Sequence, residues 1–254
     1  INTEQSESIL NLQKPDNVYQ MMFEYRNYPA IRKIKSLIDE KNRGEIINFQ
    51  ASYRHGSYLD PNRPMSWRLR EGGGATIDLA PHLIDLCNFL VGNITFSDGF
   101  KKNVIPSRPK KLNSDVMEKV NVDDYSSCFC KTASGVTGII HVSRLAMGSV
   151  DDLCLTIYGT KGALSWSLED LNFYLHSKKN GIEKIFALDD FNGLADFPPP
   201  KVSNGWLRAH AHSVYQFVSM VNDIDLPPKE LSFVPTFEDG HKVQSFLSSF
   251  GDYE

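Results

Sequence analysis

Residues 71–92, EGGGATIDLAPHLIDLCNFLVG, join three consecutive glycines to Asp78, His82 and Asp85, which are spaced by four and three residues. On an α-helix, at about 100° per residue, these three side chains fall within about 60° of one another. A carboxylate beside an imidazole holds the ring in one tautomer and raises its basicity, as a general base near neutral pH requires. The spacing therefore favours an acid–base site on one edge of a helix. The helix would pack through an apolar stripe on another edge, formed by Leu79, Leu83, Leu86, Cys87 and Leu90.

Two other interpretations of this segment stay open. Pro81 has no backbone N–H, so the helix can begin at Asp78, with Asp78 as its N-cap and the glycines as a simple loop. The Asp-x-x-x-His-x-x-Asp pattern can also hold a metal ion in a sugar isomerase or hydrolase, although no companion His or Cys cluster occurs elsewhere. Three successive glycines exceed what a cap needs, and this favours backbone in close contact with a ligand or cofactor.

Apolar patterning and turn residues predict the elements that position this motif. A polar, loosely helical lead-in (1–17) precedes a run of strand formers (18–26), and a strand at 45–55 follows a helix at 29–44. An irregular, Pro-rich stretch covers 56–71. Two strands joined at Ser134-Gly135 form a hairpin, a second pair turns at 159–162, and one more strand covers 182–188. A loop at 191–205 leads to helices at 206–224 and 236–250, the second with Thr236 and Asp239 as a capping box.

This order predicts an α+β fold in which an open, mainly antiparallel sheet has helices packed on one face. Each strand is expected to pair with its neighbour in sequence. The predicted domains are a segment at 1–17, either a lead-in or a remnant of a missing nucleotide-binding domain, and an α/β substrate-binding and oligomerisation domain at 18–254. Apolar residues of both parities in the strand Leu153–Tyr158 indicate burial on both faces. We therefore expect a homodimer or homotetramer formed through the open sheet face.

Composition narrows the class of partner. The chain has 254 residues, 41% hydrophobic, with a formal net charge of −4 and no basic block, so a nucleic-acid partner is not indicated. No apolar run reaches the roughly 18 residues of a membrane span, and the first residues lack a signal-peptide pattern. The four cysteines (87, 128, 130 and 154) are expected to be small buried hydrophobes in a reducing cytoplasm, without metal.

Five stretches, in order and over nearly the whole chain from residue 18, resemble one family of enzymes. They are FEYRNYPAIRKIKSLIDEKNRGEIINFQASY, SWRLREGGG, GGGATIDLAPHLIDLCNFLVG, LCLTIYGTKGALSWSLED and TFEDGHKVQSFLSSF. They are similar to the second domain of the glucose–fructose oxidoreductase/inositol dehydrogenase family of NAD(P)-dependent sugar oxidoreductases. That family also has a Rossmann half with a glycine-rich phosphate loop, whereas no G-x-G-x-x-G occurs in these 254 residues.

The resemblance implies a role for individual residues. His82 would take the proton of a sugar or polyol hydroxyl while hydride leaves for NAD or NADP, and Asp78 would orient His82 or hold a substrate hydroxyl. Arg26, Trp67 and Arg68 would line the pocket, and Tyr53 and His55 are further candidate substrate contacts. Gly73 and Gly74 would allow close approach of the cofactor, which a domain outside this chain would mainly bind. Asp85 is assigned to capping or neighbour contacts. The alternative is a non-catalytic sugar-binding or oligomerisation module.

Overall fold

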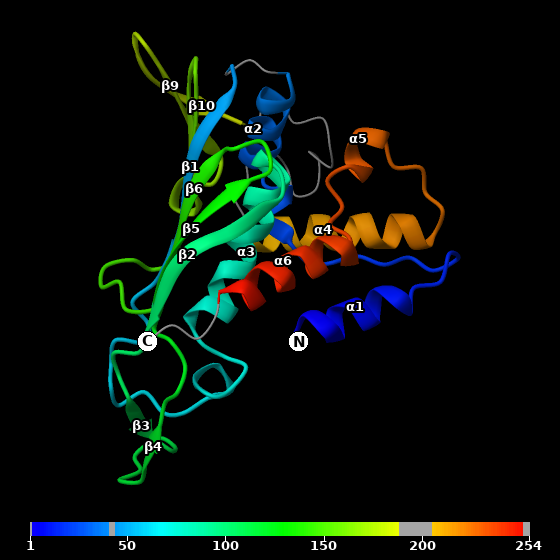
Figure 1. Ribbon diagram of the computed structural model, residues 1–254. Helices are drawn as coiled ribbons and strands as arrows, with labels where there is room; N and C mark the ends of the chain where they lie inside the picture. Colours follow the sequence, from blue (N-terminus) through cyan, green and yellow to red (C-terminus); the bar gives the residue numbers. More distant parts are fainter. Residues whose placement is uncertain (1, 41–43, 188–204, 251–254) are drawn as a thin grey trace.

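A computed structural model describes residues 2–40, 44–187 and 205–250. Its main feature is a sheet of eight strands with the helices on one face (Figure 1). In spatial order the strands are β10 (Gly181–Phe186), β9 (Phe173–Lys178), β8 (Gly162–Ser167), β7 (Asp152–Gly159), β1 (Ile46–Arg54), β6 (Thr137–Ser143), β5 (Tyr125–Thr132) and β2 (Ile94–Lys102). The predicted large, mostly antiparallel sheet is therefore confirmed.

The other elements surround this sheet. The helices are α1 (Thr3–Asn11), α2 (Pro29–Asp39), α3 (Ala75–Val91), α4 (Trp206–Val221), α5 (Pro228–Leu231) and α6 (Phe237–Ser249). Three short 3₁₀ helices are η1 (Glu24–Asn27), η2 (Trp67–Leu69) and η3 (Leu168–Asp170). A separate small hairpin consists of β3 (Ser107–Pro109) and β4 (Met117–Lys119) and extends beyond the end of the large sheet (Figure 1).

Strand β1 departs from the predicted order of pairing. It lies between β6, to which it is parallel, and β7, to which it is antiparallel. Gln50 is paired with Ile139 on one side and with Thr156 on the other. The expectation that each strand pairs with its neighbour in sequence is therefore wrong at the centre of the sheet, where one early strand separates two later groups.

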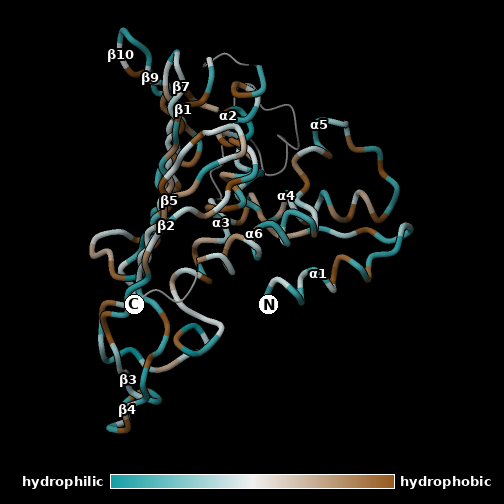
Figure 2. The backbone as a smooth tube through the Cα atoms, viewed as in Figure 1, coloured by the Kyte–Doolittle hydropathy of each residue, from teal (hydrophilic) through white to brown (hydrophobic). Residues whose placement is uncertain are grey.

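Alternation along the strands creates one buried and one open face. In β1, Phe49, Ala51 and Tyr53 are buried against the helices, whereas Gln50 is exposed on the open face. Figure 2 shows hydrophobic and hydrophilic residues interleaved along the strands in this way. The apolar residues of α3 complete the core because this helix packs on β1 and β6. The sheet therefore fixes the position of α3, which carries the acid–base motif.

Several local predictions are confirmed. The hairpin at Ser134-Gly135 joins β5 to β6, the turn at 159–162 joins β7 to β8, and β10 occupies the predicted final strand. Thr236 and Asp239 form the expected capping box at the start of α6. Three cysteines are buried and Cys154 is half-buried, all four as free thiols. Nearly all of the predicted loop at 191–205 lies outside the described residues.

Three predictions on element type and extent need correction. The run of strand formers at 18–26 is not a strand: it is extended without sheet pairing and then enters η1, where Tyr25 is buried. The helices predicted to extend to residues 44 and 224 end at Asp39 and Val221. The lead-in contains α1, which packs on α6 through hydrogen bonds between the hydroxyls of Thr3 and Ser248 (2.6 Å) and between Ser6 and His241 (2.9 Å). No helix in the described ranges is long and apolar enough to cross a membrane.

Candidate active site

Helix α3 begins earlier than the alternative interpretation requires. Its N-cap is Gly74, with φ of 102°, and Asp78 lies one turn inside the helix together with Pro81. The proposal that Asp78 is the N-cap is therefore wrong, and its carboxylate is free to take part in other interactions. Asp78 and His82, four residues apart, are neighbours on the helix surface, as their spacing predicts.

The glycine run is explained by contacts within the chain. A Cβ at Gly73 would lie 2.5 Å from the carbonyl oxygen of Arg68, and a Cβ at Gly74 would collide with the Asp123 carboxylate. The Gly73 N–H donates to the Arg70 carbonyl at 2.8 Å, and that of Gly74 donates to the Arg68 carbonyl at 2.9 Å. The close approach predicted for a cofactor at these two glycines is thus taken up by the protein's own turn, residues 68–74.

A cavity of about 340 Å³ opens beside the first turns of α3, and we call it the His82 cavity. Its lining residues come from β1 and the segment after it, η2, α3 and the loop after β6: Tyr53, His55, Ser57, Tyr58, Arg63, Arg68, Asp78, Leu79, His82 and Asp151. The structure therefore brings together five of the residues that the sequence selected, namely Tyr53, His55, Arg68, Asp78 and His82. A small sugar or polyol is of a size that such a cavity accommodates.

Two arginines hold the Asp78 carboxylate. The Arg68 Nε donates to both carboxylate oxygens at 3.2 Å, and the fully buried Arg144 donates from Nη2 to Oδ2 at 3.1 Å. Arg144 also donates to the carbonyls of Arg68 (3.0 Å) and Gly74 (2.6 Å), which ties the glycine turn to the same network. Among the described residues no hydrogen bond joins Asp78 to His82, so Asp78 acts on the imidazole through its charge.

The His82 imidazole lies between aromatic rings. Tyr25 meets it edge to face at 5.0 Å between centroids, and Tyr53 does so at 6.1 Å. Its Nδ1 is buried without a hydrogen-bond partner in the described part of the chain. Burial lowers the pKa of His82 to about 4, although the negative charges of Asp78 and Asp151 oppose this shift. The ring is therefore neutral at pH 7 and able to accept a proton.

The other aromatic and imidazole groups of the cavity are also positioned. The hydroxyls of Tyr53 and Tyr25 lie 3.1 Å apart, and burial raises the pKa of both phenols, so both remain protonated donors. The His55 Nδ1 lies 2.8 Å from the Ser57 hydroxyl. Burial and then the nearby Arg144 lower the pKa of His55, against opposing effects of Asp151 and Asp78. The cavity therefore contains two imidazoles with lowered pKa values.

Arg26 does not line the His82 cavity. Its buried guanidinium donates to Asp85 from Nε (2.9 Å) and Nη2 (2.5 Å) and to Asp239 from Nη1 (3.2 Å). These bonds join η1 to α3 and α6, so the predicted pocket role of Arg26 is corrected to a structural one. The assignment of Asp85 to neighbour contacts is confirmed by the same pair, and Asp85 does not share the cavity with Asp78 and His82.

Trp67 also lies outside the cavity lining. It is 60% exposed, and its ring lies 4.4 Å from the guanidinium carbon of Arg68. Trp67 thus contacts the arginine that holds Asp78 rather than the cavity itself.

Sequence reasoning missed four polar residues of this site: Ser57, Arg63, Arg144 and Asp151. Arg144 follows β6 immediately, and Asp151 ends the loop that leads to β7. No local motif marks them, because only the pairing of β1 with β6 and β7 brings this loop to α3. Within the described ranges, no group of three or more His, Cys, Asp or Glu side chains is arranged to hold a metal ion.

The sequence and fold of this chain resemble those of known proteins. Levoglucosan dehydrogenase of Pseudarthrobacter phenanthrenivorans is 30% identical over 270 residues, which cover 94% of this chain and 66% of that protein. A levoglucosan dehydrogenase structure in complex with NADH and L-sorbose superposes with a TM-score of 0.87 at 25% identity, covering 98% of this chain and 67% of that one. An inositol dehydrogenase homologue from Azotobacter vinelandii, complexed with NADH and myo-inositol, shares the fold at 14% identity (TM-score 0.79, 99% of this chain and 69% of that one).

This chain therefore spans about two thirds of the length of these relatives. The model of the GFO/IDH/MocA C-terminal domain matches residues 31–165. The matched segment contains every residue that lines the His82 cavity, from Tyr53 to Asp151. The chain belongs to the GFO/IDH/MocA family.

Proposed function

We propose that this chain is the substrate-binding part of an NAD(P)-dependent oxidoreductase that acts on a sugar, a polyol or a related hydroxyl compound. The observation that carries the proposal is the neutral His82 imidazole beside Asp78 and Asp151 in one cavity. The relatives that match over most of the chain include levoglucosan dehydrogenase, and its structure holds NADH and L-sorbose.

In this proposal His82 is the general base. A neutral imidazole accepts the proton of a substrate hydroxyl, and the charges of Asp78 and Asp151 stabilise the imidazolium that results. Asp78 cannot rotate freely because Arg68 and Arg144 hold it, so it provides a fixed negative charge. Asp151 is exposed at the cavity and available to accept hydrogen bonds from substrate hydroxyls.

In this proposal the chain contacts the nicotinamide end of the cofactor and does not bind the whole dinucleotide. The sequence has no G-x-G-x-x-G, and the bare backbone of Gly73 and Gly74 faces the chain's own atoms. When bound, the nicotinamide supplies the hydride acceptor. We infer that residues outside this chain bind the remainder of the cofactor, and that this chain binds the polyol and holds its proton acceptor.

The test is the reduction of NAD or NADP by the protein with levoglucosan, myo-inositol and glucose, followed by absorbance. His82→Gln should lower kcat by about 10²- to 10⁴-fold with a smaller effect on KM, because it removes the proton acceptor. His141→Gln is the matched control, because His141 lies on the open sheet face and bonds Ser127. Full activity in His82→Gln would contradict the assignment of the base.

The alternative is a non-catalytic sugar-binding or oligomerisation module. Calorimetry with the same polyols separates the two. Polyol binding that His82→Gln weakens, without hydride transfer to either nicotinamide in a protein that also contains the residues that bind the cofactor, would support the module and exclude the enzyme.

A further inference from the structure

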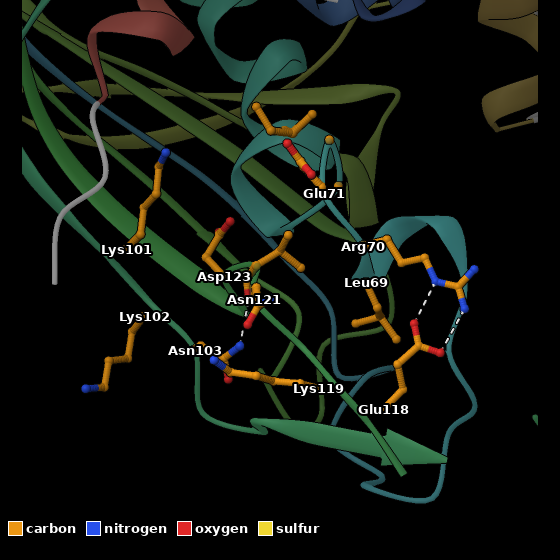
Figure 3. Close-up of a pocket in the computed structure, with 14 residues that line it drawn as sticks. Leu69, Arg70, Glu71, Lys101, Lys102, Asn103, Glu118, Lys119, Asn121 and Asp123 are labelled. Atoms are coloured by element: carbon orange, nitrogen blue, oxygen red, sulfur yellow. Dashed lines mark hydrogen bonds and ion pairs between the residues drawn. The ribbon is translucent and has the colours of Figure 1, made fainter. Parts of the chain in front are cut away.

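A second cavity, of about 850 Å³, lies beside the same glycine turn (Figure 3). It shares no lining residue with the His82 cavity: Arg70 and Ile77 face the second cavity, whereas Arg68 and Asp78 face the first. Its wall is formed by the end of β2 with Asn103, by β4, by residues 121–123 and by residues 69–73. Figure 3 shows Lys101 and Lys102 on one side of this cavity and the Arg70–Glu118 pair on the other.

Two of the three carboxylates that line the second cavity accept hydrogen bonds from other groups of the protein. Arg70 donates to both oxygens of Glu118 at 3.0 and 3.1 Å. Asp123 accepts from the backbone N–H and the hydroxyl of Thr76, each at 2.8 Å. Of the three lining carboxylates, Glu71 is the one that has no such bond among the described residues.

The lysines of the second cavity are not neutralised in this way. Within the described ranges no carboxylate lies within ion-pair distance of Lys101, Lys102 or Lys119, and the last two are exposed. Lys101 contacts the face of the Phe250 ring at 5.2 Å, and its charge acts on the Asp123 carboxylate, whose pKa it lowers against the larger effect of burial. Because the chain as a whole carries a net charge of −4, this group of ammonium ions is a local feature.

One neutral group of the cavity lacks a partner. The Asn103 amide nitrogen donates to the carbonyls of Val120 (2.8 Å) and Val122 (2.9 Å), so the orientation of the amide is fixed. Its oxygen, Oδ1, is buried and accepts no hydrogen bond within the described residues. An acceptor of this kind is satisfied by a donor such as a hydroxyl group.

We propose that the second cavity binds a small phosphate ester that carries free hydroxyl groups. The ammonium groups of Lys102 and Lys119 would bind the phosphate, and Asn103 would accept from a hydroxyl. Gly72 forms part of the wall without a side chain and has open space where a Cβ would lie, so a ligand can approach the backbone there. The volume lies in the range of small-molecule sites. The proposal does not depend on the function proposed for the His82 cavity.

Calorimetry without nicotinamide tests this site, with glycerol 3-phosphate, inorganic phosphate and malonate as probes. Glycerol 3-phosphate should bind most tightly, because it offers both a phosphate and hydroxyls, and added salt should weaken its binding. Lys102→Glu/Lys119→Glu should weaken the binding of glycerol 3-phosphate by about tenfold or more. The matched control is Lys110→Glu/Lys111→Glu, two exposed lysines between β3 and β4 that do not line the cavity.

Three results would overturn the proposal: no saturable binding of glycerol 3-phosphate at millimolar concentration, equal loss of binding in the control variant, or tighter binding of malonate. His82→Gln should leave the binding of glycerol 3-phosphate unchanged. Loss of this binding in His82→Gln would place the anion in the His82 cavity and also contradict the proposal. Failure of the dehydrogenase assay, by contrast, leaves this measurement unaffected.

Discussion

Arg144 and Asp78 are joined by a 3.1 Å hydrogen bond between a fully buried guanidinium and a carboxylate that lines the His82 cavity. They lie 66 positions apart in the sequence. Through its bonds to the carbonyls of Arg68 and Gly74, the same guanidinium also holds both ends of the glycine turn. One side chain thus fixes the charge nearest to the proposed base and the backbone that leads into α3.

Arg144→Met should destabilise the protein by about 2–4 kcal/mol, because it removes three hydrogen bonds of a fully buried guanidinium and with them one of the two donors to each of the Arg68 and Gly74 carbonyls. Urea unfolding measures this loss of free energy. Arg70→Met is the matched control: Arg70 forms an exposed ion pair with Glu118, whose loss costs less than about 1 kcal/mol. Equal effects of the two substitutions would contradict the structural role of Arg144.

Gly73→Ala should disrupt the glycine turn, since the new Cβ would lie 2.5 Å from the Arg68 carbonyl oxygen. We expect a loss of about 1–3 kcal/mol in the free energy of unfolding, together with weaker polyol binding, because Arg68 moves away from Asp78. Gly72→Asn is the control: position 72 has φ of 81°, which Asn tolerates, and open space around its Cβ. If Gly73→Ala has the same free energy of unfolding and the same polyol binding as the wild type, the turn accommodates the new Cβ without a change in the site, and the prediction is wrong.

The buried carboxyl of Glu24 is expected to make the free energy of unfolding depend on pH. Burial raises its pKa from 4.5 to about 7, and the nearby Asp85 adds to the shift, while the His210 Nδ1 lies 3.9 Å from its carboxylate. Between pH 4.5 and 7 the folded state retains this proton and the unfolded state loses it, so this contribution to stability decreases as pH rises through that window. The full decrease corresponds to about 3 kcal/mol.

Glu24→Gln should therefore be more stable than the wild type at pH 8, by about 1–3 kcal/mol, and should show little difference at pH 4.5. Thermal unfolding at a series of pH values, compared as differences between variant and wild type, measures the effect. Glu7→Gln, at an exposed position of α1, is the control substitution. A difference between Glu24→Gln and the wild type that does not vary with pH would be evidence against the shifted carboxyl.

The open face of the sheet presents an apolar pair that favours self-association. Phe129 and Ile139 lie opposite each other on β5 and β6, and are 58% and 39% exposed. Phe129→Glu/Ile139→Glu should convert a dimer or tetramer to a monomer, because charges replace the apolar contact. Light scattering at micromolar concentration measures the mass. Val104→Glu/Leu112→Glu, at exposed apolar positions outside the large sheet, should leave the mass unchanged, and a monomeric wild-type protein would refute self-association through this face.

Local patterns in the sequence were enough to predict elements that depend on local interactions. The capping box at Thr236, the hairpin between β5 and β6 and the helical spacing of Asp78 and His82 each involve residues within a few positions of one another. The segment 18–26 misled because its aromatic residues are buried by tertiary contacts, not by sheet pairing, and strand propensity does not separate these cases.

The rest of the site depends on long-range pairing that has no local signal. Arg144 and Asp151 reach Asp78 and His82 because β6 and β7 flank β1, and nothing in the sequence marks the parallel pairing of β1 with β6. The ion pairs of Arg26 were also not predictable, because they depend on the positions of both Asp85 on α3 and Asp239 on α6. For Arg26, residue type identified a buried cation's chemistry, and the fold determined its partners.

The position of β1 has a consequence for the assembly of the chain. The ladder β7–β8–β9–β10 is continuous in sequence, and the ladder β6–β5–β2 is interrupted in sequence by the small hairpin β3–β4. Within the described residues β1 is the strand that connects the two ladders. Without β1, one edge of each ladder would expose unpaired N–H and carbonyl groups, which are templates for pairing with other chains. A folding intermediate in which β1 has not yet inserted is therefore the species from which this protein would aggregate.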